Sequence, residues 1–200
     1  LGLSGTVSEP GLRAELVAAG RALGGTDDWT LRSSAALSAL AWRLSSLNLR
    51  IGESDFSSDL TLDLGPAGLR GGFSLRVPDL EQFAGLMPSV WQPAGSLKID
   101  GSFSGDRSSP RLEAELIGRG LSGNGQQLPS LAASLVVSPD LAELSKLVVE
   151  QGDGRLEASV RIVPATSRYA ASLTGRGFSL TPWIDAGGGE QPLAATVDLD

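Results

Sequence analysis

The sequence predicts a mainly β protein whose strands pair antiparallel. Apolar and polar residues alternate with period two in segment after segment of the 200 residues, and this period places successive side chains on opposite faces of a strand. The 26 Gly and 11 Pro supply turns between these segments, as in hairpins and meanders. Parallel sheets are covered on both faces and have continuous apolar strands, so the alternation favours an antiparallel sheet with one dry face.

Eight segments carry the alternation and are predicted strands. They are residues 12–16, 47–51, 60–64, 73–77, 97–99, 112–116, 156–162 and, more weakly, 169–173. Glycine-rich clusters at 24–25, 65–66, 71–72, 152–154 and 187–189 are predicted turns between them.

Two short helices are also expected. Asp79 can cap a helix over 80–87, with Gln82 three residues later and Pro88 as the stop. Asp140 and Glu143 can do the same for a helix over 141–147.

A third segment has leucines at positions 37, 40, 44 and 47, which is helical spacing. Its serine-rich filling fits a strand about as well, so both interpretations stay open.

An internal repeat is indicated at an offset of 100 residues. Residues 10–20 and 110–120 share six of eleven identities, and further matches follow at the same offset, Leu44 with Leu144 among them. The run Gly-Phe-Ser-Leu at 72–75 recurs at 177–180 after a shift of five residues. We therefore expect two β units, 1–100 and 101–200, continuous with each other in one elongated domain. A chance match in a chain rich in Leu, Ser and Gly is the alternative.

Composition excludes several classes of function. The chain has no His and no Cys, which removes Ser-His-Asp and Cys-His nucleophile systems and metal sites built on those residues. Its net charge is −7 and its 16 basic residues are scattered, so nucleic acid is not an expected partner.

No run of about 18 apolar residues is present to span a bilayer as a helix. The chain starts at Leu1, and residues 194–200 have the pattern of a strand cut in mid-course. We therefore expect a piece of a longer protein, with any membrane anchor outside it.

A family resemblance comes from longer phrases. They are residues 95–105 (GSLKIDGSFSG), 109–116 (SPRLEAEL), 120–122 and 128–131, 156–160 (LEASV) and 47–56 (LNLRIGESDF). Together they resemble the long β repeats of the TamB family (translocation and assembly module) within the wider AsmA-like group. The likeness covers most of the chain, and it consists of common residues and turn glycines rather than a chemical signature.

The resemblance implies an elongated, curved antiparallel sheet with an open apolar groove, in the periplasm and anchored to the inner membrane through a segment outside this chain. It implies no enzymatic activity and no cofactor. The expected function is that of a bridge that moves phospholipid acyl chains between the inner and outer membrane and supports outer-membrane biogenesis and protein assembly. The expected partners are phospholipid and, through the full-length protein, an outer-membrane partner of the TamA type.

The predicted lipid-binding residues are apolar positions of the alternating segments. They are Leu60, Leu62, Leu64, Phe73, Leu75, Val77, Leu97, Ile99, Phe103, Leu112, Leu116, Leu156, Val160 and Ile162.

A closed β-sandwich is the alternative fold, because a sheet normally buries its dry face against a second layer. A secreted adhesion or carbohydrate-binding module with such a core is the corresponding alternative function. The chain has 5 Phe, 4 Trp and 1 Tyr, which is few for two packed layers. The four Trp are spread along the sequence rather than clustered for sugar stacking.

Overall fold

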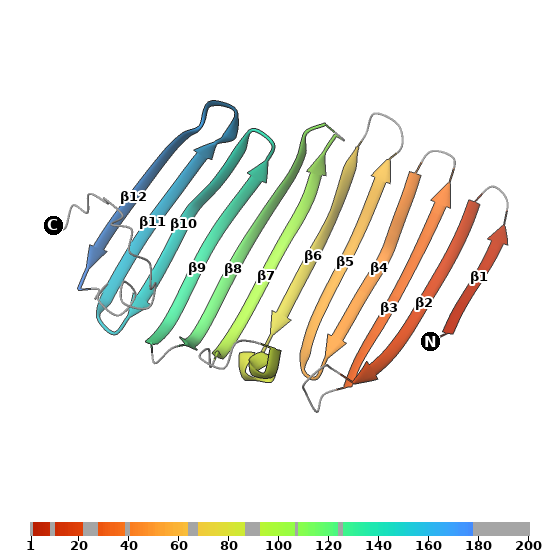
Figure 1. Cartoon of the computed structure of the whole chain (residues 1–200), viewed down its shortest axis with the longest axis horizontal. Helices are drawn as coiled ribbons and strands as arrows, with labels where there is room; N and C mark the ends of the chain where they lie inside the picture. Colours follow the sequence, from red (N-terminus) through yellow and green to blue (C-terminus); the bar gives the residue numbers. More distant parts are fainter. Residues whose placement is uncertain are drawn as a thin grey trace.

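The structure, a computed structural model, describes residues 2–8, 11–21, 28–38, 41–63, 68–86, 93–106, 108–123 and 126–177. In these residues a 12-stranded sheet has its strands in chain order, and Figure 1 shows them side by side from β1 to β12. Every pairing is antiparallel. The strands are β1 (Gly2–Ser8), β2 (Gly11–Arg21), β3 (Asp28–Ser38), β4 (Ala41–Ile51), β5 (Ser54–Asp63), β6 (Leu69–Val77), β7 (Ala94–Gly105), β8 (Pro110–Gly123), β9 (Gln126–Ser138), β10 (Leu141–Gln151), β11 (Gly154–Val163) and β12 (Arg168–Arg176).

The sheet is open, and the prediction of a mainly β, antiparallel, open fold is confirmed. The total accessible surface of the chain is 13694 Å², about 1.5 times the ~8,900 Å² expected for a compact monomer of its mass. No described side chain of large volume is fully buried. The alternative of a closed sandwich is therefore wrong for the described part of the chain, which contains no second layer to cover the sheet.

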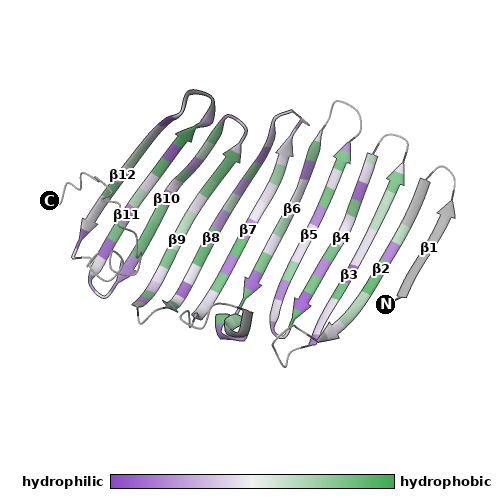
Figure 2. Ribbon diagram, viewed as in Figure 1, coloured by the Kyte–Doolittle hydropathy of each residue, from purple (hydrophilic) through white to green (hydrophobic). Residues whose placement is uncertain are grey.

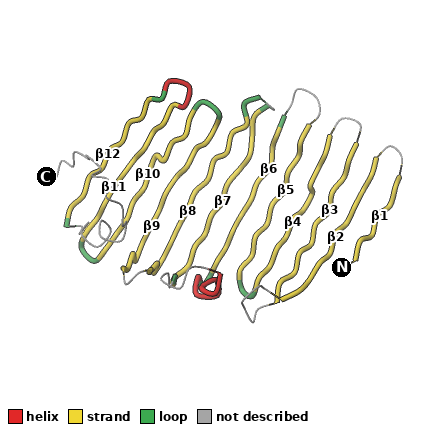
Figure 3. The backbone as a smooth tube through the Cα atoms, viewed as in Figure 1, coloured by secondary structure: helices red, strands yellow, loops and turns green. Residues whose placement is uncertain are grey.

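The only helical elements in the described ranges are two 3₁₀ turns, η1 (Leu80–Leu86) and η2 (Pro164–Thr166) (Figure 3). The predicted helix over 80–87 is present as η1, and the Oδ1 atom of Asp79 accepts a hydrogen bond from the backbone N–H of Glu81. Residues 87 and 88 lie outside the described ranges.

The predicted helix over 141–147 is wrong, because these residues lie in β10. The pairing of β10 has an irregularity between Leu144 and Leu147. A β-bulge inserts one extra residue, so two side chains of one strand face become three positions apart. The helix is predicted from Asp140 and Glu143, and Asp140 lies in the turn between β9 and β10, where Asp is favoured as it is at a helix N-cap.

A bulge also explains the helical spacing of the leucines in residues 37–47, for which helix and strand are both predicted. Those that the structure describes lie in β3 and β4, and β4 has a register shift between Leu44 and Leu47 against β5. Leu40 lies outside the described residues.

One predicted turn is also wrong. Gly71 and Gly72 lie inside β6 rather than between strands. A Cβ atom at Gly71 would collide with the backbone carbonyl oxygen of Asp59 on β5. Gly71 is thus needed for a close approach of two strands and not for a turn. The clusters at 24–25, 65–66 and 187–189 lie outside the described residues, whereas Gly152 and Asp153 do form the turn between β10 and β11.

Strand registers recur 100 positions apart in the described chain. Leu44 pairs with Leu60 and Leu47 with Ser58, while Leu144 pairs with Val160 and Leu147 with Ala158. The pairings of β2 with β3 and of β5 with β6 recur likewise in β8 with β9 and in β11 with β12. The counterpart of β6 is therefore β12, without the five-residue shift that the Gly-Phe-Ser-Leu match requires.

Candidate functional site

Strand register assigns each side chain to one of two faces. Residues directly opposite each other in an antiparallel pair have their side chains on the same face. Phe103 on β7 is opposite Gly71 on β6 and Leu112 on β8, and Leu112 is opposite Val137 on β9. Following such pairs from strand to strand collects the apolar residues on one face, the apolar face, and most charged residues on the other, the polar face. Figure 2 shows apolar and hydrophilic positions alternating along the strands.

The apolar face is continuous across the sheet. Its central row contains only apolar side chains from β2 to β12. These are Ala18, Leu31, Leu49, Phe56, Leu75, Ile99, Leu116, Ala133, Leu147, Ala158 and Leu173. At about 4.8 Å per strand, such a row is about 50 Å long.

The structure places every predicted lipid-binding residue that it describes on the apolar face. Only Leu64 lies outside the described residues. Ile99, for example, lies between Leu75 and Leu116 in the central row, and Val160 lies beside Leu144. The structure therefore brings these residues onto one surface, and their binding of lipid stays a prediction.

Several residues of this face were not in the predicted set. Trp29 and Leu31 on β3, Leu131 and Leu135 on β9, and Leu144 on β10 belong to it by register. The bulge in β10 concealed one of these strands, and serines and alanines between the leucines weakened the signal in the other two.

No second layer covers this face in the described residues. Its apolar side chains are therefore shielded from water only by their neighbours on the same face. Phe73 lies over Gly101 of the neighbouring strand, where even a Cβ atom would collide with its ring. The rings of Phe73 and Phe103 are 5.1 Å apart between centroids and inclined by 38°, which is a favourable aromatic distance.

The 3₁₀ turn η1 covers one end of the apolar face. Ser54 is 4% exposed and Val77 is 4% exposed. The side-chain nitrogen of Gln82, in η1, donates hydrogen bonds to the Ser54 hydroxyl and to the carbonyl oxygen of Asp79. The buried hydroxyl is thus paired, as a buried polar group must be.

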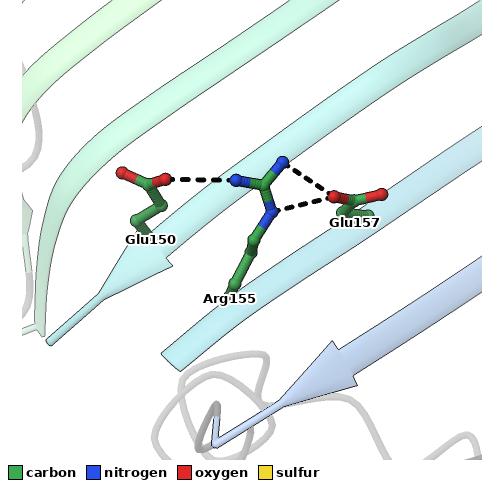
Figure 4. Close-up of polar contacts among 3 residues, drawn as sticks. All are labelled: Glu150, Arg155 and Glu157. Carbon is green, nitrogen blue, oxygen red and sulfur yellow. Dashed lines mark hydrogen bonds and ion pairs between the residues drawn. The ribbon is translucent and has the colours of Figure 1, made fainter. Parts of the chain in front are cut away.

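Ion pairs decorate the polar face. The Nε atom of Arg155 donates to Glu157 at 2.8 Å, and its Nη1 atom donates to Glu150 across the hairpin at 3.4 Å (Figure 4). All three side chains are about half exposed, so each pair contributes at most about 1 kcal/mol to stability. The charged side chains of this face are hydrated.

One carboxylate of the polar face has a shifted pKa. Asp100 accepts a hydrogen bond from Lys98 at 2.6 Å and one from the Ser74 hydroxyl at 2.8 Å. The Lys98 bond, followed by the Ser74 bond, holds the pKa of Asp100 below its ordinary value of 3.8. The Asp100 side chain is half exposed, and its bonds to Lys98 and Ser74 link two neighbouring strands of the sheet.

The polar face also carries a shallow hollow of about 410 Å³ between β4 and β7. Short side chains produce it, chiefly Ser46, Ser57 and Ser74, with Gly72 at its floor. The hydroxyl of Ser46 is hydrogen-bonded to that of Ser34 at 2.9 Å, and Ser74 is bonded to Asp100. These polar groups partner one another.

The motif Gly118-Arg-Gly-Leu-Ser-Gly123 has dinucleotide-binding spacing but lies wholly inside β8. Gly120 has φ +59°, and the pairing of β8 with β7 shifts register at this point, as at a bulge whose first residue is glycine. The strand β9 follows instead of the helix N-terminus that would bind a pyrophosphate.

Among the described residues no group of three or more acidic, His or Cys side chains is placed to hold a metal ion. Within the same ranges, no helix has the length and apolarity needed to cross a bilayer.

Comparison with protein-family models, curated proteins and solved structures gives no match for this chain.

Proposed function

We propose that this chain is a segment of a bridge-like lipid transfer protein that holds phospholipid acyl chains on its apolar face. The observation that carries the proposal is the uninterrupted apolar face of an open sheet. Leu37, Leu135, Val137, Ile162 and Tyr169 of this face are exposed, and exposed apolar patches mark binding surfaces. The resemblance to the TamB and AsmA-like repeats supports the same function.

The chemistry of the face suits an acyl chain. Each methylene that leaves water gains about 0.8 kcal/mol, so a carrier needs a continuous apolar lining rather than hydrogen-bond donors. The central row offers Leu, Ile, Ala and Phe and no polar group. Such a lining binds by area and shape, and it gives little selectivity between acyl chains.

The cellular part of the proposal rests on the resemblance alone. It places the protein in the periplasm, anchored to the inner membrane by a segment outside this chain, where it moves phospholipid between the two membranes and supports outer-membrane protein assembly. An outer-membrane partner of the TamA type belongs to the same proposal.

The alternative of an adhesion or carbohydrate-binding module has no observation in its favour. It requires a closed core, which the described residues do not form. Stacking on sugar rings requires clustered exposed aromatics, yet Tyr169 is the one aromatic residue among the large exposed hydrophobics of the described ranges.

The test compares two double variants matched in exposure and residue type. Val137→Asp with Ile162→Asp changes the apolar face at side chains that are 36% and 43% exposed. Val17→Asp with Ile117→Asp changes the polar face at side chains that are both 44% exposed. Both proteins are purified in mild detergent, checked for folding by circular dichroism, and analysed by native mass spectrometry with identification of co-purified lipid.

We expect phospholipid on the unchanged protein and on the polar-face variant, and several-fold less on the apolar-face variant. Equal lipid on both folded variants would contradict the proposal. So would an unchanged protein that carries no lipid and takes none up from added phospholipid.

A further inference from the structure

The two end strands of the sheet, β1 and β12, match a pair of strands that is already formed in its middle. Among the described residues, β1 and β12 each pair with one strand only, and they lie at opposite ends of the sheet (Figure 1). The recurrence at 100 positions makes β12 the counterpart of β6 and β11 the counterpart of β5. The free edge of β12 in the described chain therefore corresponds to the edge on which β6 pairs with β7.

The strand β1 is in turn the counterpart of β7. Residues 1–8 (LGLSGTVS) align with residues 97–104 (LKIDGSFS), with Leu, Gly and Ser identical at three positions. Both strands have the same register on the strand that follows them. The opposite residues are Leu3 with Leu16, Gly5 with Ala14 and Val7 with Leu12 for β1, and Ile99 with Leu116, Gly101 with Ala114 and Phe103 with Leu112 for β7. The edge of β1 away from β2 therefore corresponds to the edge of β7 that pairs with β6.

Neither end strand has the features that usually prevent edge pairing. Native proteins protect edge strands with charged residues, proline or bulges. Residues 2–8 and 169–175 contain no charged residue and no proline. The pairings of β1 with β2 and of β11 with β12 have no register shift. Both edges are therefore suited to pair with a further strand.

We propose that β12 pairs with β1 of a second copy of this chain, antiparallel and in the register of β6 with β7. This register places Leu173 opposite Gly5 of the second copy, as Phe73 is opposite Gly101. A Cβ atom at Gly101 would collide with the Phe73 ring, and the new pair repeats this combination of a large residue with glycine. A second copy supplies a partner for both edges at once.

The association is head to tail and does not close. Each copy binds through β12 and leaves its own β1 for the next copy, so a third chain can add to the second. Backbone hydrogen bonds supply the affinity, as in other cases of strand addition to a sheet edge. The edges, not the apolar face, make the contact, so the proposal is independent of lipid binding.

The experiment traps the pairing as a disulfide between two chains, since the chain has no Cys of its own. One chain carries Thr174→Cys. The other carries Ser4→Cys and an affinity tag that changes its mass. Directly opposite residues of an antiparallel pair have Cα atoms about 4.5–5.5 Å apart, which is within disulfide range. Oxidation takes place in mild detergent, which covers the apolar faces and suppresses association through them.

Two matched pairs serve as controls. Ser74→Cys with Asp100→Cys in one chain is the positive control, because the native side chains at this corresponding pair are hydrogen-bonded at 2.8 Å. Thr174→Cys with Thr6→Cys, again in two chains, is the register control. The second pair is diagonal in the proposed register, with Cα atoms about 7–8 Å apart, which is too far for a disulfide. Circular dichroism checks that every variant folds.

We expect several-fold more linked heterodimer from positions 174 and 4 than from positions 174 and 6, and more than the homodimer of either single variant. Equal yields from the two heterotypic pairs would overturn the proposal. So would a preferred homodimer of Thr174→Cys, which would show that two β12 edges pair with each other. A disulfide within one chain between Thr174→Cys and Asp200→Cys, 100 positions after Asp100, would overturn it as well, because the same chain would then cover β12.

Discussion

At the scale of single residues, glycines decide where strands and rings can approach. A Cβ atom at Gly101 would collide with the ring of Phe73 and come within 2.7 Å of the Glu113 carbonyl oxygen. At Gly72, on the neighbouring strand, the nearest atom is the Oδ1 atom of Asp59 at 3.4 Å, which is ordinary contact. The two glycines are thus a matched pair, one required by packing and one not.

We expect Gly101→Ala to lower the free energy of unfolding by about 1–3 kcal/mol, the usual cost of overpacking. Gly72→Ala should be neutral or raise it by up to about 1 kcal/mol, because alanine loses less backbone entropy on folding. Urea unfolding followed by circular dichroism measures both. A loss at Gly72 equal to that at Gly101 would mean that ring packing is not the reason for glycine.

The bonds of Asp100 predict a pH dependence. Its folded pKa lies below 3.8, so the carboxylate stabilises the fold above pH 3.8, and this contribution is lost as pH falls through the folded pKa. We expect Asp100→Asn to flatten the part of the stability curve below pH 3.8. Thermal unfolding between pH 2 and pH 6 tests this. Asp55→Asn, on the same face, is the comparison, and an unchanged acid limb in Asp100→Asn would contradict the assignment.

At the scale of elements, bulges keep two strands in phase with the apolar face. In β10, Leu144 is opposite Val160 and Leu147 is opposite Ala158, so the segment between the two leucines has one residue more than β11. The extra residue bends and twists the strand locally. It leaves both leucines on one face, as the pairing of each with an apolar residue shows.

Deletion of Lys146 should therefore be tolerated. It removes the extra residue and leaves Leu144 and Leu147 two positions apart, on the same face, with an expected change in stability below about 1 kcal/mol. Deletion of Ser159 from the regular strand β11 should cost more than about 3 kcal/mol, because it turns Val160 and Ile162 away from the apolar face or breaks their pairing. Thermal unfolding of the two variants compares them, and a more damaging Lys146 deletion would refute the bulge.

At the scale of the whole molecule, the sheet extends without folding back. Twelve strands at about 4.8 Å spacing extend over about 53 Å. A sandwich of two six-stranded layers would be about half as long in that direction. The excess of accessible surface over that of a compact monomer has the same cause, since a single layer leaves both of its faces in contact with solvent.

Small-angle X-ray scattering of the protein in solution tests this shape. We expect a flat, elongated particle whose cross-section is about one sheet thick, on the order of 10 Å. A compact particle with a cross-section about two sheets thick would show that the sheet closes on itself or pairs face to face. Measurement over a range of concentrations separates these two cases.

The fold could be predicted where the alternation is regular. Residues 112–116 and 156–162 show a strict period of two, and both lie in strands with the expected face toward the apolar side. The helix predicted at 141–147 is wrong because the residue expected to cap it, Asp140, lies in the turn before β10, and Asp is favoured both in turns and at helix N-caps. The turn predicted at 71–72 is wrong because close approach of two strands, as at Gly71, and turn formation both favour glycine.

The sequence by itself determined that this is a sheet protein with one apolar and one polar face, because period two in the residue pattern is period two in side-chain direction. It also determined the absence of His and Cys chemistry. The tertiary structure alone decided that the sheet stays open in the described residues, since an alternating strand is equally suited to a covered or an uncovered face. It also decided which apolar residues are still in contact with water, because that depends on the neighbours that the strand register and η1 bring to each side chain.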